Sequence, residues 1–445
     1  MNTLKSFDPS NGELLGEFPL SNKEKINDTL RQAKIATKSW KQLSMPERVQ
    51  HVKAAYAQIE PEAGRLAELL SREMGKDINR ASGEVDGAIY SAAYYADETM
   101  AALQTRSVSR GTELHYKALG VVAVISPWNY PVMMANNLIV PALVAGNCVI
   151  LKPSEETPLI AQAFYEHLVR HLPDGVFNLL HGDGEVGKML VESDVDLIAF
   201  TGSQAVGKDI MARSASKLKR LVMELGGNDP MIVMANTNIE RAARFAVASS
   251  FENAGQMCTS TERIYVDEAI ADEFEQMVVN IASQYKVGAW DEPGVNIGPI
   301  INARQHGKII EHIRDAIEKG GKCLLGGIEQ PERYIHPTVI SHVTSEMKMA
   351  QEETFGPIVS ITRYSNIEQA ITLANDSDYG LGAVVFGTEG AEAVAHQLEA
   401  GMIGINQGPG GSGDAPWVGA KQSGFGFHGS AEGHRQFAQV TVLGK

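Results

Sequence analysis

Short apolar runs rich in β-branched residues alternate with helix-length segments from residue 121 onward. A first set of runs lies at 121–126, 148–152, 176–180, 197–201 and 220–224. A second set lies at 231–234, 263–266, 335–340, 358–364, 383–386 and 402–406. Strands separated by helical segments form βαβ units, and such units build parallel sheets. The sequence therefore predicts an α/β fold with two such sheets, with helices near 238–251 and up to about residue 286.

The segments that flank this alternation have other patterns. Two possible capping boxes, at 21–24 and 44–47, precede apolar residues at three- and four-residue spacing, so the first hundred residues are predicted to be helical. The polar stretch 104–119 has the pattern of an extended arm or hairpin. The C-terminal "QFAQVTVLGK" alternates like a strand, and could pair with this arm or with a neighbouring subunit.

Composition limits the classes of function. Of the 445 residues, 44% are hydrophobic and 21% are charged, as in globular proteins. The net charge of −15 argues against nucleic acid or an anionic membrane as the main partner. Three scattered cysteines are too few for a disulfide framework or a Cys-rich zinc site, so we expect no metal and a reducing cytoplasm. We also expect no signal peptide and no membrane-spanning stretch.

Two glycine-containing turns are candidates for phosphate binding. "GDGEVG" at 182–187 fits the G-x-G-x-x-G pattern, which brings backbone close to a pyrophosphate at a helix N-terminus. The pattern is weak in a chain with 43 glycines, and the next predicted strand lacks the acidic residue of a dinucleotide fingerprint. "FTGSQAVG" at 200–207 is the better candidate, because Gly202 and Ser203 lie between a predicted strand and a predicted helix.

A third candidate segment, "LKPSEETP" at 151–158, also follows a predicted strand. Open α/β sheets bind ligands at this end of their strands. Lys152 could reach a phosphate or a ribose, and Glu155 could accept hydrogen bonds from ribose hydroxyls. An ordinary solvated loop with an N-cap is the alternative interpretation of the segment.

The three cysteines have different surroundings. Cys148 lies in an apolar strand and is interpreted as structural, and Cys323 as structural or incidental. Cys258 lies among small and polar residues in "NAGQMCTSTE", which leaves catalysis and a structural role equally open. Glu224 ends a predicted strand in "MELGGNDP" and is a candidate general base for activating water, with a surface glutamate as the alternative.

The segment "ISPWNYP" at 125–131 ends a further strand with two prolines that stiffen the turn. Asn129 could donate its amide N–H to a developing oxyanion. Taken alone, Trp128 is as well explained as a packing residue and Asn129 as a turn residue.

Together these segments resemble the aldehyde dehydrogenase superfamily over nearly the whole chain. The matching motifs, in that family's order and spacing, are "SPWNYP", "GNCVILKPSEETP", "FTGS", "MELGGNDP", "NAGQMCTSTERIYV", "EETFGPI", "NDSDYGLGAVVF" and "VGAKQSGFG". The resemblance implies a modified Rossmann cofactor domain, a second α/β catalytic domain and a β-arm for oligomerisation into a homodimer or homotetramer. The expected boundaries are 1–103 with 120–225 for the cofactor domain, 226–425 for the catalytic domain, and 104–119 with 426–445 for the arm.

The resemblance also implies roles for residues at the matching positions. Cys258 would be the nucleophile that attacks the aldehyde, and Glu224 the base that activates water to hydrolyse the resulting thioester. Asn129 and the backbone N–H of Cys258 would form the oxyanion hole. The family does not use the 182–187 turn in the usual way. The NAD(P) site would instead be formed by Trp128, Lys152, Ser154, Glu155, Gly202, Ser203, Gly207, Glu353 and Phe355.

Substrate and cofactor choice follow less directly from the resemblance. The helix after "WNYP" carries no arginine or lysine that could hold a distant carboxylate. Succinate semialdehyde is nevertheless the first named candidate for the small aldehyde substrate, and a neutral small or aromatic aldehyde is nearly level with it. Glu155 would repel a 2′-phosphate, so NAD is predicted to be preferred and NADP tolerated. The substrate tunnel is predicted to be lined by the loop 407–419 and by Met133, Met134, Asn137, Met257 and Thr259.

Two departures and three alternatives accompany this hypothesis. Asn228 stands where many members have lysine, and Met257 where a cysteine or isoleucine is common. A CoA-acylating dehydrogenase would have no need of Glu224. A non-catalytic relative would be expected to lose the nucleophile or the base. A cysteine hydrolase without cofactor would leave the segments at 151–158 and 200–203 unexplained.

Overall fold

The computed structural model describes residues 3–410 and 415–445. The chain begins with an antiparallel hairpin of β1 (Thr3–Phe7) and β2 (Leu14–Pro19), so the prediction that the first hundred residues are helical is wrong for this segment. The hairpin is held by the Ser6 hydroxyl, which donates a buried hydrogen bond of 2.7 Å to Glu73. This contact joins residues 67 positions apart and has no signature in the local sequence. The helical pattern downstream was therefore extended to the N-terminus.

Helices occupy the rest of the first hundred residues. The helix α1 (Lys23–Trp40) is capped by Asn22, one residue beyond the start of the predicted capping box. The second predicted box is confirmed, because Ser44 and Glu47 exchange hydrogen bonds at the start of α2 (Met45–Ala57). A short 3-10 turn, η1 (Glu60–Glu62), then leads to α3 (Ala63–Met74) and the long helix α4 (Ile78–Ala102).

The first large sheet contains the five strands expected from the first set of apolar runs. These are β5 (Val121–Ile125), β6 (Cys148–Lys152), β7 (Phe177–Leu179), β8 (Leu197–Gly202) and β9 (Arg220–Leu225). They are parallel in the spatial order β9-β8-β5-β6-β7. The chain therefore reverses direction across the sheet between β5 and β8, where ligands bind in open α/β sheets. The intervening helices are α5 (Met133–Val144), α6 (Pro158–Val169), α7 (Gly184–Glu192) and α8 (Gln204–Ser214), which is followed by the 3-10 turn η2 (Ala215–Lys217).

The second large sheet has the order β12-β13-β14-β11-β10-β15-β16. All neighbours in it are parallel except the edge strand β12, which pairs antiparallel with β13. Its strands are β10 (Asp229–Val233), β11 (Thr261–Asp267), β12 (Lys322–Leu325), β13 (Thr338–Ser341), β14 (Ile358–Tyr364), β15 (Gly382–Phe386) and β16 (Met402–Ile405). The associated helices are α9 (Ile239–Phe251), η3 (Glu252–Gly255), α10 (Ala271–Ala282), α11 (Ala303–Glu318), α12 (Lys348–Gln351), α13 (Ile367–Asn375) and α14 (Ala391–Ala395).

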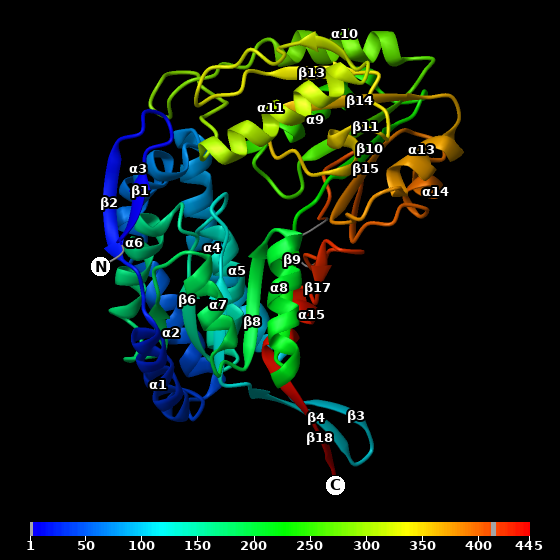
Figure 1. Ribbon diagram of the computed structural model, residues 1–445. Coiled ribbons are helices and arrows are strands. Elements are labelled where there is room, and N and C mark those ends of the chain that lie inside the picture. The colour runs from blue at the N-terminus through cyan, green and yellow to red at the C-terminus, as the bar shows by residue number, and fades with distance from the viewer. Residues whose placement is uncertain (1–2, 411–414) are drawn as a thin grey trace.

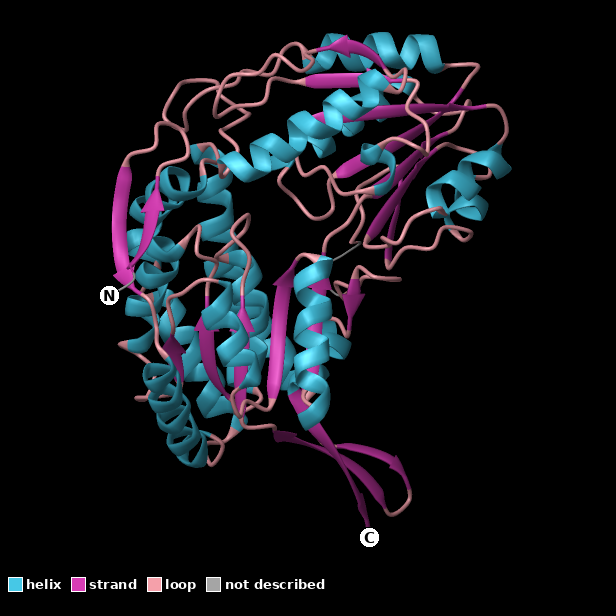
Figure 2. Ribbon diagram, viewed as in Figure 1, coloured by secondary structure: helices cyan, strands magenta, loops and turns pink. Residues whose placement is uncertain are grey.

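Apolar side chains are buried around each sheet, and the two α/β bodies lie one above the other (Figures 1 and 2). The chain passes directly from the end of β9 to the start of β10 through residues 226–228. It later returns to the first sheet as β17 (Gly424–Phe425), which pairs antiparallel with β9. The carboxyl ends of the first sheet's strands therefore face the second body, and the connection at 226–228 lies between them.

The C-terminal segment packs on the first body and then leaves it. The short helix α15 (Ser430–His434) contacts α4, and η4 (Arg435–Phe437) follows. The last strand, β18 (Ala438–Gly444), pairs with β4 (Thr112–Ala118), which pairs with β3 (Arg106–Ser109). The predicted pairing of the tail with the 104–119 segment is confirmed. This small sheet projects from the molecule at the end away from the second body (Figure 1).

In the described residues, no helix is both long and apolar enough to cross a membrane.

Candidate active site

A cavity of about 630 Å³ lies where the strand ends of the first sheet face the second body. The loops after β5, β6, β8 and β9 contribute to its wall, together with the segment before β11, the loop before β14 and the start of α11. Twelve of the residues predicted from the sequence line it: Trp128, Asn129, Met134, Lys152, Ser154, Glu155, Gly202, Ser203, Glu224, Cys258, Glu353 and Phe355.

The loop that carries Cys258 has an unusual backbone. Asn253, Ala254 and Gly255 have φ angles of 51°, 58° and 73°, so three consecutive residues adopt the left-handed conformation. A Cβ atom on Gly255 would lie 2.1 Å from the carbonyl of Gly356, so only glycine fits there. This turn ends the helical segment after α9 and brings Cys258 to the cavity wall.

Carboxyl groups surround the Cys258 thiol. The pKa of the thiol is raised well above its usual value, mainly because the thiol is buried. The nearby carboxyl of Glu224 raises it further, and those of Asp229 and Glu353 add smaller effects. Burial raises the pKa of Glu224 to about 8, although the Cys258 thiol opposes this shift. Glu224 is 4% exposed and its Oε1 has no hydrogen-bond partner among the described residues. The Glu224 carboxyl and the Cys258 thiol are therefore neighbours at the cavity wall.

Hydrogen bonds hold both the side-chain amide and the main-chain carbonyl of Asn129. Its side-chain Nδ2 donates a hydrogen bond of 3.0 Å to the carbonyl of Gln256, two residues before Cys258. Its own carbonyl accepts from Asn253 at 3.2 Å and from the ammonium of Lys76 at 2.8 Å. An amide nitrogen carries two N–H groups, and in the described part of the chain the second has no partner. That N–H is available to an oxygen atom bound beside Cys258.

The other side of the cavity carries groups suited to phosphate and ribose. Lys152 is buried at the end of β6 and lies 3.5 Å from the carboxylate of Glu155. Burial lowers the pKa of Lys152, and Glu155 opposes that shift. Ser203 is the N-cap residue of α8, and its hydroxyl makes no capping bond, so it is available for a ligand at this helix N-terminus.

The 182–187 turn is arranged differently from a dinucleotide fingerprint. Gly184 and Gly187 line the cavity, but the Asp183 side chain caps α7 by accepting from the N–H groups of Glu185 and Val186. A carboxylate thus already occupies the helix N-terminus where a pyrophosphate would bind. The G-x-G-x-x-G pattern in the sequence was accordingly only a weak indication of a dinucleotide fingerprint.

The loop 353–355 reaches the cavity from the second body. Its conformation is held by Glu262, which accepts hydrogen bonds of 2.6 and 2.7 Å from the N–H groups of Thr354 and Phe355. Phe355 has a φ of 58° and packs edge-on against Trp128, with 5.5 Å between ring centroids. Burial raises the pKa of both Glu262 and Glu353. Glu353 also accepts a hydrogen bond of 3.1 Å from the N–H of Gly227.

Some predicted residues do not line this cavity. Gly207 is buried, and a Cβ atom there would lie 2.6 Å from Leu225, so this glycine lets α8 pack against β9. Met133 points toward α4, where its Sδ lies 3.9 Å from the Ser91 hydroxyl. Asn137, Met257 and Thr259 are also absent from the wall. Of the predicted loop 407–419, residues 411–414 lie outside the described part of the chain.

Sequence reasoning missed several residues of the site. Lys188 on α7 adds a cation to the wall, and the start of α11 contributes Arg304, Gln305 and Lys308. Trp417, by contrast, belongs to the predicted loop 407–419; it lies near Glu224 and opposes the rise in pKa that burial causes there. Cationic residues on an amphipathic helix have no local signal that separates a ligand site from a solvated face. Of the other cysteines, Cys148 is buried in β6 and Cys323 is exposed on β12.

Comparison with known proteins decides between the classes that such a site could serve. The chain matches the sequence profile described as "Aldehyde dehydrogenase family" over residues 1–443. The chain belongs to the aldehyde dehydrogenase family. It is an NAD(P)-dependent oxidoreductase that oxidises an aldehyde. The expected α/β architecture of the family is therefore confirmed.

Individual relatives cover almost the whole chain. It is 36% identical over 449 residues to a "Probable succinate-semialdehyde dehydrogenase [NADP(+)]" of Sinorhizobium fredii, covering 98% of this chain and 91% of the relative. It is also 36% identical over 440 residues to "Aminoaldehyde dehydrogenase 2, peroxisomal" of Pisum sativum, covering 94% and 87%. Among solved structures, an "E. coli NADP dependent enzyme" matches with a TM-score of 0.95 at 32% identity, covering 99% of this chain and 94% of that one. Aldehyde dehydrogenases similar to this chain thus bear the names of substrates with opposite charge.

Proposed function

We propose that Cys258 is the nucleophile of this aldehyde dehydrogenase, with Glu224 as general base and Asn129 in the oxyanion hole. The observation that carries the proposal is their convergence on one end of the cavity, from three separate segments of the chain. The Cys258 thiol gives up its proton to solvent in the cavity as sulfur bonds to the aldehyde carbon, which leaves Glu224 for the later hydrolysis step. The free N–H of Asn129 and the backbone N–H of Cys258 then stabilise the oxyanion.

The rest of the cavity fits a nicotinamide dinucleotide. Lys152, Lys188 and Arg304 bring positive charge to the wall for a pyrophosphate, and the Ser203 hydroxyl at the N-terminus of α8 is a further donor. Glu155 accepts hydrogen bonds from the ribose hydroxyls, and its charge repels a 2′-phosphate. NAD is therefore preferred over NADP. When bound, the oxidised nicotinamide supplies the hydride acceptor and a positive charge beside the thiol. Glu353 and Phe355 orient the nicotinamide end of the cofactor against Cys258.

Loss of hydride converts the sulfur-bound hemiacetal to a thioester on Cys258. Glu224 then removes a proton from water as the water attacks the thioester carbonyl, and the thiolate leaves. The carboxylic acid is released. Retention of a buried base next to the thiol favours hydrolysis over transfer to CoA, for which no base is needed to activate water.

Succinate semialdehyde is one candidate substrate, supported by the names of the relatives. A neutral or aromatic aldehyde is the second candidate, and a specific feature of the substrate side favours it. Arg80 of α4 lies near the Cys258 loop, but its guanidinium is paired with Asp77 at 2.6 Å and with Glu252 at 2.9 Å. Aromatic and apolar side chains that line the cavity include Trp128, Tyr130, Met134 and Phe355.

The arm formed by β3, β4 and β18 is proposed to mediate assembly into a dimer or tetramer. Val440 and Val442 on β18 are 45% and 66% exposed, and no other described strand pairs with the outer edge of β3. Exposed apolar side chains on a projecting strand are typical of an interface. Three free cysteines favour a reducing compartment, and the cytoplasm is proposed on that basis.

The test is a panel of aldehydes assayed with NAD and with NADP, with Cys258→Ala as the blank. The panel should include succinate semialdehyde, an aminoaldehyde, a short neutral aldehyde and an aromatic aldehyde. The expected product is the free acid, formed with one reduced cofactor per aldehyde, and no turnover by the Cys258→Ala variant. Full activity of that variant, or formation of acyl-CoA as the only product when CoA is added, would contradict the proposal.

A further inference from the structure

A buried ion pair lies directly behind the proposed oxyanion hole. Lys76, in the turn between α3 and α4, has a side chain that is 0% exposed, and its partner Glu84 on α4 is 1% exposed. Neither residue lines the cavity. Buried charges cost free energy unless they are paired and hydrogen-bonded, and a hydrophobic pair of the same volume would often be as stable. The pair therefore needs an explanation other than stability.

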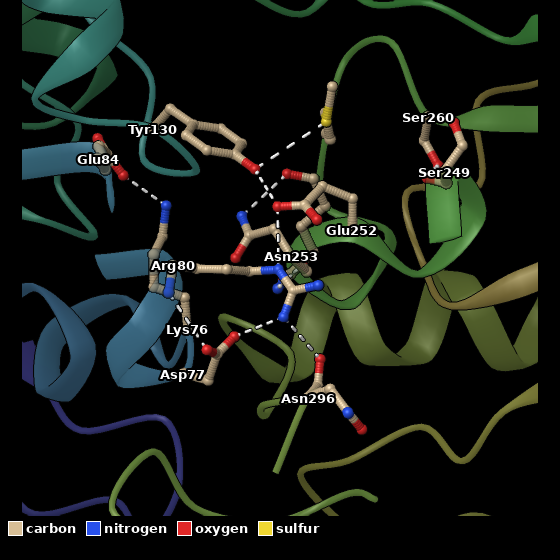
Figure 3. A network of polar contacts seen from close by, with 12 residues as sticks. Lys76, Asp77, Arg80, Glu84, Tyr130, Ser249, Glu252, Asn253, Ser260 and Asn296 are labelled. Atoms are coloured by element: carbon tan, nitrogen blue, oxygen red, sulfur yellow. Dashed lines mark hydrogen bonds and ion pairs between the residues drawn. The ribbon is translucent and has the colours of Figure 1, made fainter. Parts of the chain in front are cut away.

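Every recorded side-chain bond of this pair beyond the ion pair itself reaches residues 129–133, the segment that carries Asn129. Figure 3 shows the Lys76–Glu84 ion pair with Tyr130 nearby. The Lys76 ammonium donates to the carbonyl of Asn129 at 2.8 Å and lies 3.8 Å from the centre of the Tyr130 ring. Glu84 accepts from the N–H groups of Val132 and Met133, at 2.9 and 3.2 Å. These two N–H groups stand at the start of α5, where a carboxylate is also favoured by the helix dipole.

The same segment is joined to the Cys258 loop on its other side. Asn253 donates from one amide to the carbonyls of both Asn129 and Gln256. Asn129 donates its own amide to Gln256 at 3.0 Å. The position of the Asn129 amide relative to Cys258 thus depends on a carbonyl that Lys76 holds from behind. Because an oxyanion hole acts only when its donors are already in place, small shifts here are costly.

We propose that Lys76 and Glu84 are positioning residues, which fix the Asn129 main chain and the start of α5 so that one amide N–H points at the oxyanion on Cys258. The inference rests on the proposed function, because it assumes that Asn129 serves the oxyanion. The pair touches neither substrate nor cofactor. Its loss should therefore slow the formation of the acyl-enzyme without weakening cofactor binding.

The decisive variant is the double substitution Lys76→Met with Glu84→Gln. Lys76→Met alone leaves the Glu84 charge buried and unpaired, which threatens the fold. The double variant contains neither charge, and the glutamine oxygen can still accept from Val132 and Met133. What it lacks is the ammonium that holds the Asn129 carbonyl. A matched control is Arg363→Met with Glu275→Gln, which removes an ion pair of 2.7 Å between β14 and α10.

Four quantities are measured on the full-length enzyme: the midpoint of thermal unfolding, the Kd for NAD, the kcat and KM for the best aldehyde, and the rate of the first turnover. For the Lys76→Met/Glu84→Gln variant, the first-turnover rate should fall about 10- to 100-fold. The Kd for NAD should stay within about twofold, because the cofactor wall is untouched. The control pair should leave the first-turnover rate unchanged, even if its unfolding midpoint moves.

A double variant with a first-turnover rate within twofold of the parent overturns the proposal. So does a variant in which the unfolding midpoint and NAD affinity collapse together with the rate, because that result assigns the pair a general structural role. The parent enzyme separates this test from that of the proposed function. If the parent forms no acyl adduct on Cys258, the proposed function fails. If the parent forms the adduct and the double variant has the same first-turnover rate, only the positioning role is refuted.

Discussion

Replacing Glu224 with glutamine separates the two halves of the reaction. Glutamine has the shape of glutamate, and the site already holds the carboxyl buried with its Oε1 unpartnered. The variant should fold at least as well as the parent, because an uncharged amide avoids the cost of burying a carboxylate. It cannot, however, take a proton from water. The thioester on Cys258 should therefore form and then persist.

The size of the effect follows from the pKa of Glu224, which burial raises to about 8. With this pKa, about a tenth of the molecules carry the ionised base at pH 7, about half at pH 8 and about nine tenths at pH 9. In the parent, the rate of thioester hydrolysis should therefore rise roughly fivefold from pH 7 to pH 8, and less than twofold from pH 8 to pH 9. Loss of a general base typically slows its step about 10²- to 10⁴-fold.

The assay is rapid mixing of enzyme, aldehyde and NAD, followed by the absorbance of the reduced nicotinamide. The Glu224→Gln variant should release a burst of one reduced cofactor per subunit, and then turn over slowly with no rise between pH 7 and pH 9. A parent-like steady-state rate, or the same pH dependence in parent and variant, would refute the assignment of Glu224 as the base. Failure of the burst with normal NAD binding would mean that Glu224 acts earlier, as the proton acceptor for the thiol.

Three further outcomes are expected. Asn129→Ala should lower kcat about 10²- to 10³-fold with little change in the Kd for NAD, measured by steady-state kinetics and cofactor titration. Glu155→Gln should raise the ratio of kcat/KM for NADP over NAD by about tenfold, since a like charge near the 2′-phosphate is removed; an unchanged ratio would place the 2′-hydroxyl elsewhere. Glu262→Gln should flatten the pH dependence of stability. Burial raises the folded-state pKa of Glu262. Its contribution to the free energy of unfolding is therefore fully present below the unfolded-state pKa near 4.5 and is lost as the pH rises toward the folded-state pKa. Denaturant titrations of the parent should show this loss as a slope of up to about 1.4 kcal/mol per pH unit, which the variant should lack.

The strands of both large sheets could be predicted because each is short, apolar and bounded by turn residues. The prediction of 148–152 agrees with β6 at both ends, since all five residues of that strand are buried on both faces. Edge and hairpin strands gave weaker patterns. The strand β12 (Lys322–Leu325) is exposed at its first two residues, and β1 has only one buried residue, so neither carries the apolar run that revealed the central strands.

The candidate site divides in the same way. Cys258, Glu224 and Asn129 lie in segments with a distinctive local sequence, directly beside predicted strands. Lys76 lies in a turn between two helices and Lys308 lies on α11, and only the folded chain brings Lys76 to the Asn129 segment and Lys308 to the cavity. Glu262 shows the same limit, because its two acceptor bonds reach residues more than ninety positions away. Local patterns therefore predict the groups that we propose to react, whereas the groups that hold them in place emerge from tertiary contacts.

The most direct test of the central claim is intact-mass spectrometry of the Glu224→Gln enzyme after mixing with aldehyde and NAD. We predict an increase equal to one acyl group per chain, located on Cys258 by peptide mapping and absent from the Cys258→Ala, Glu224→Gln double variant. An unmodified Cys258 in enzyme that has produced reduced cofactor, or an acyl group on another residue, would contradict the account.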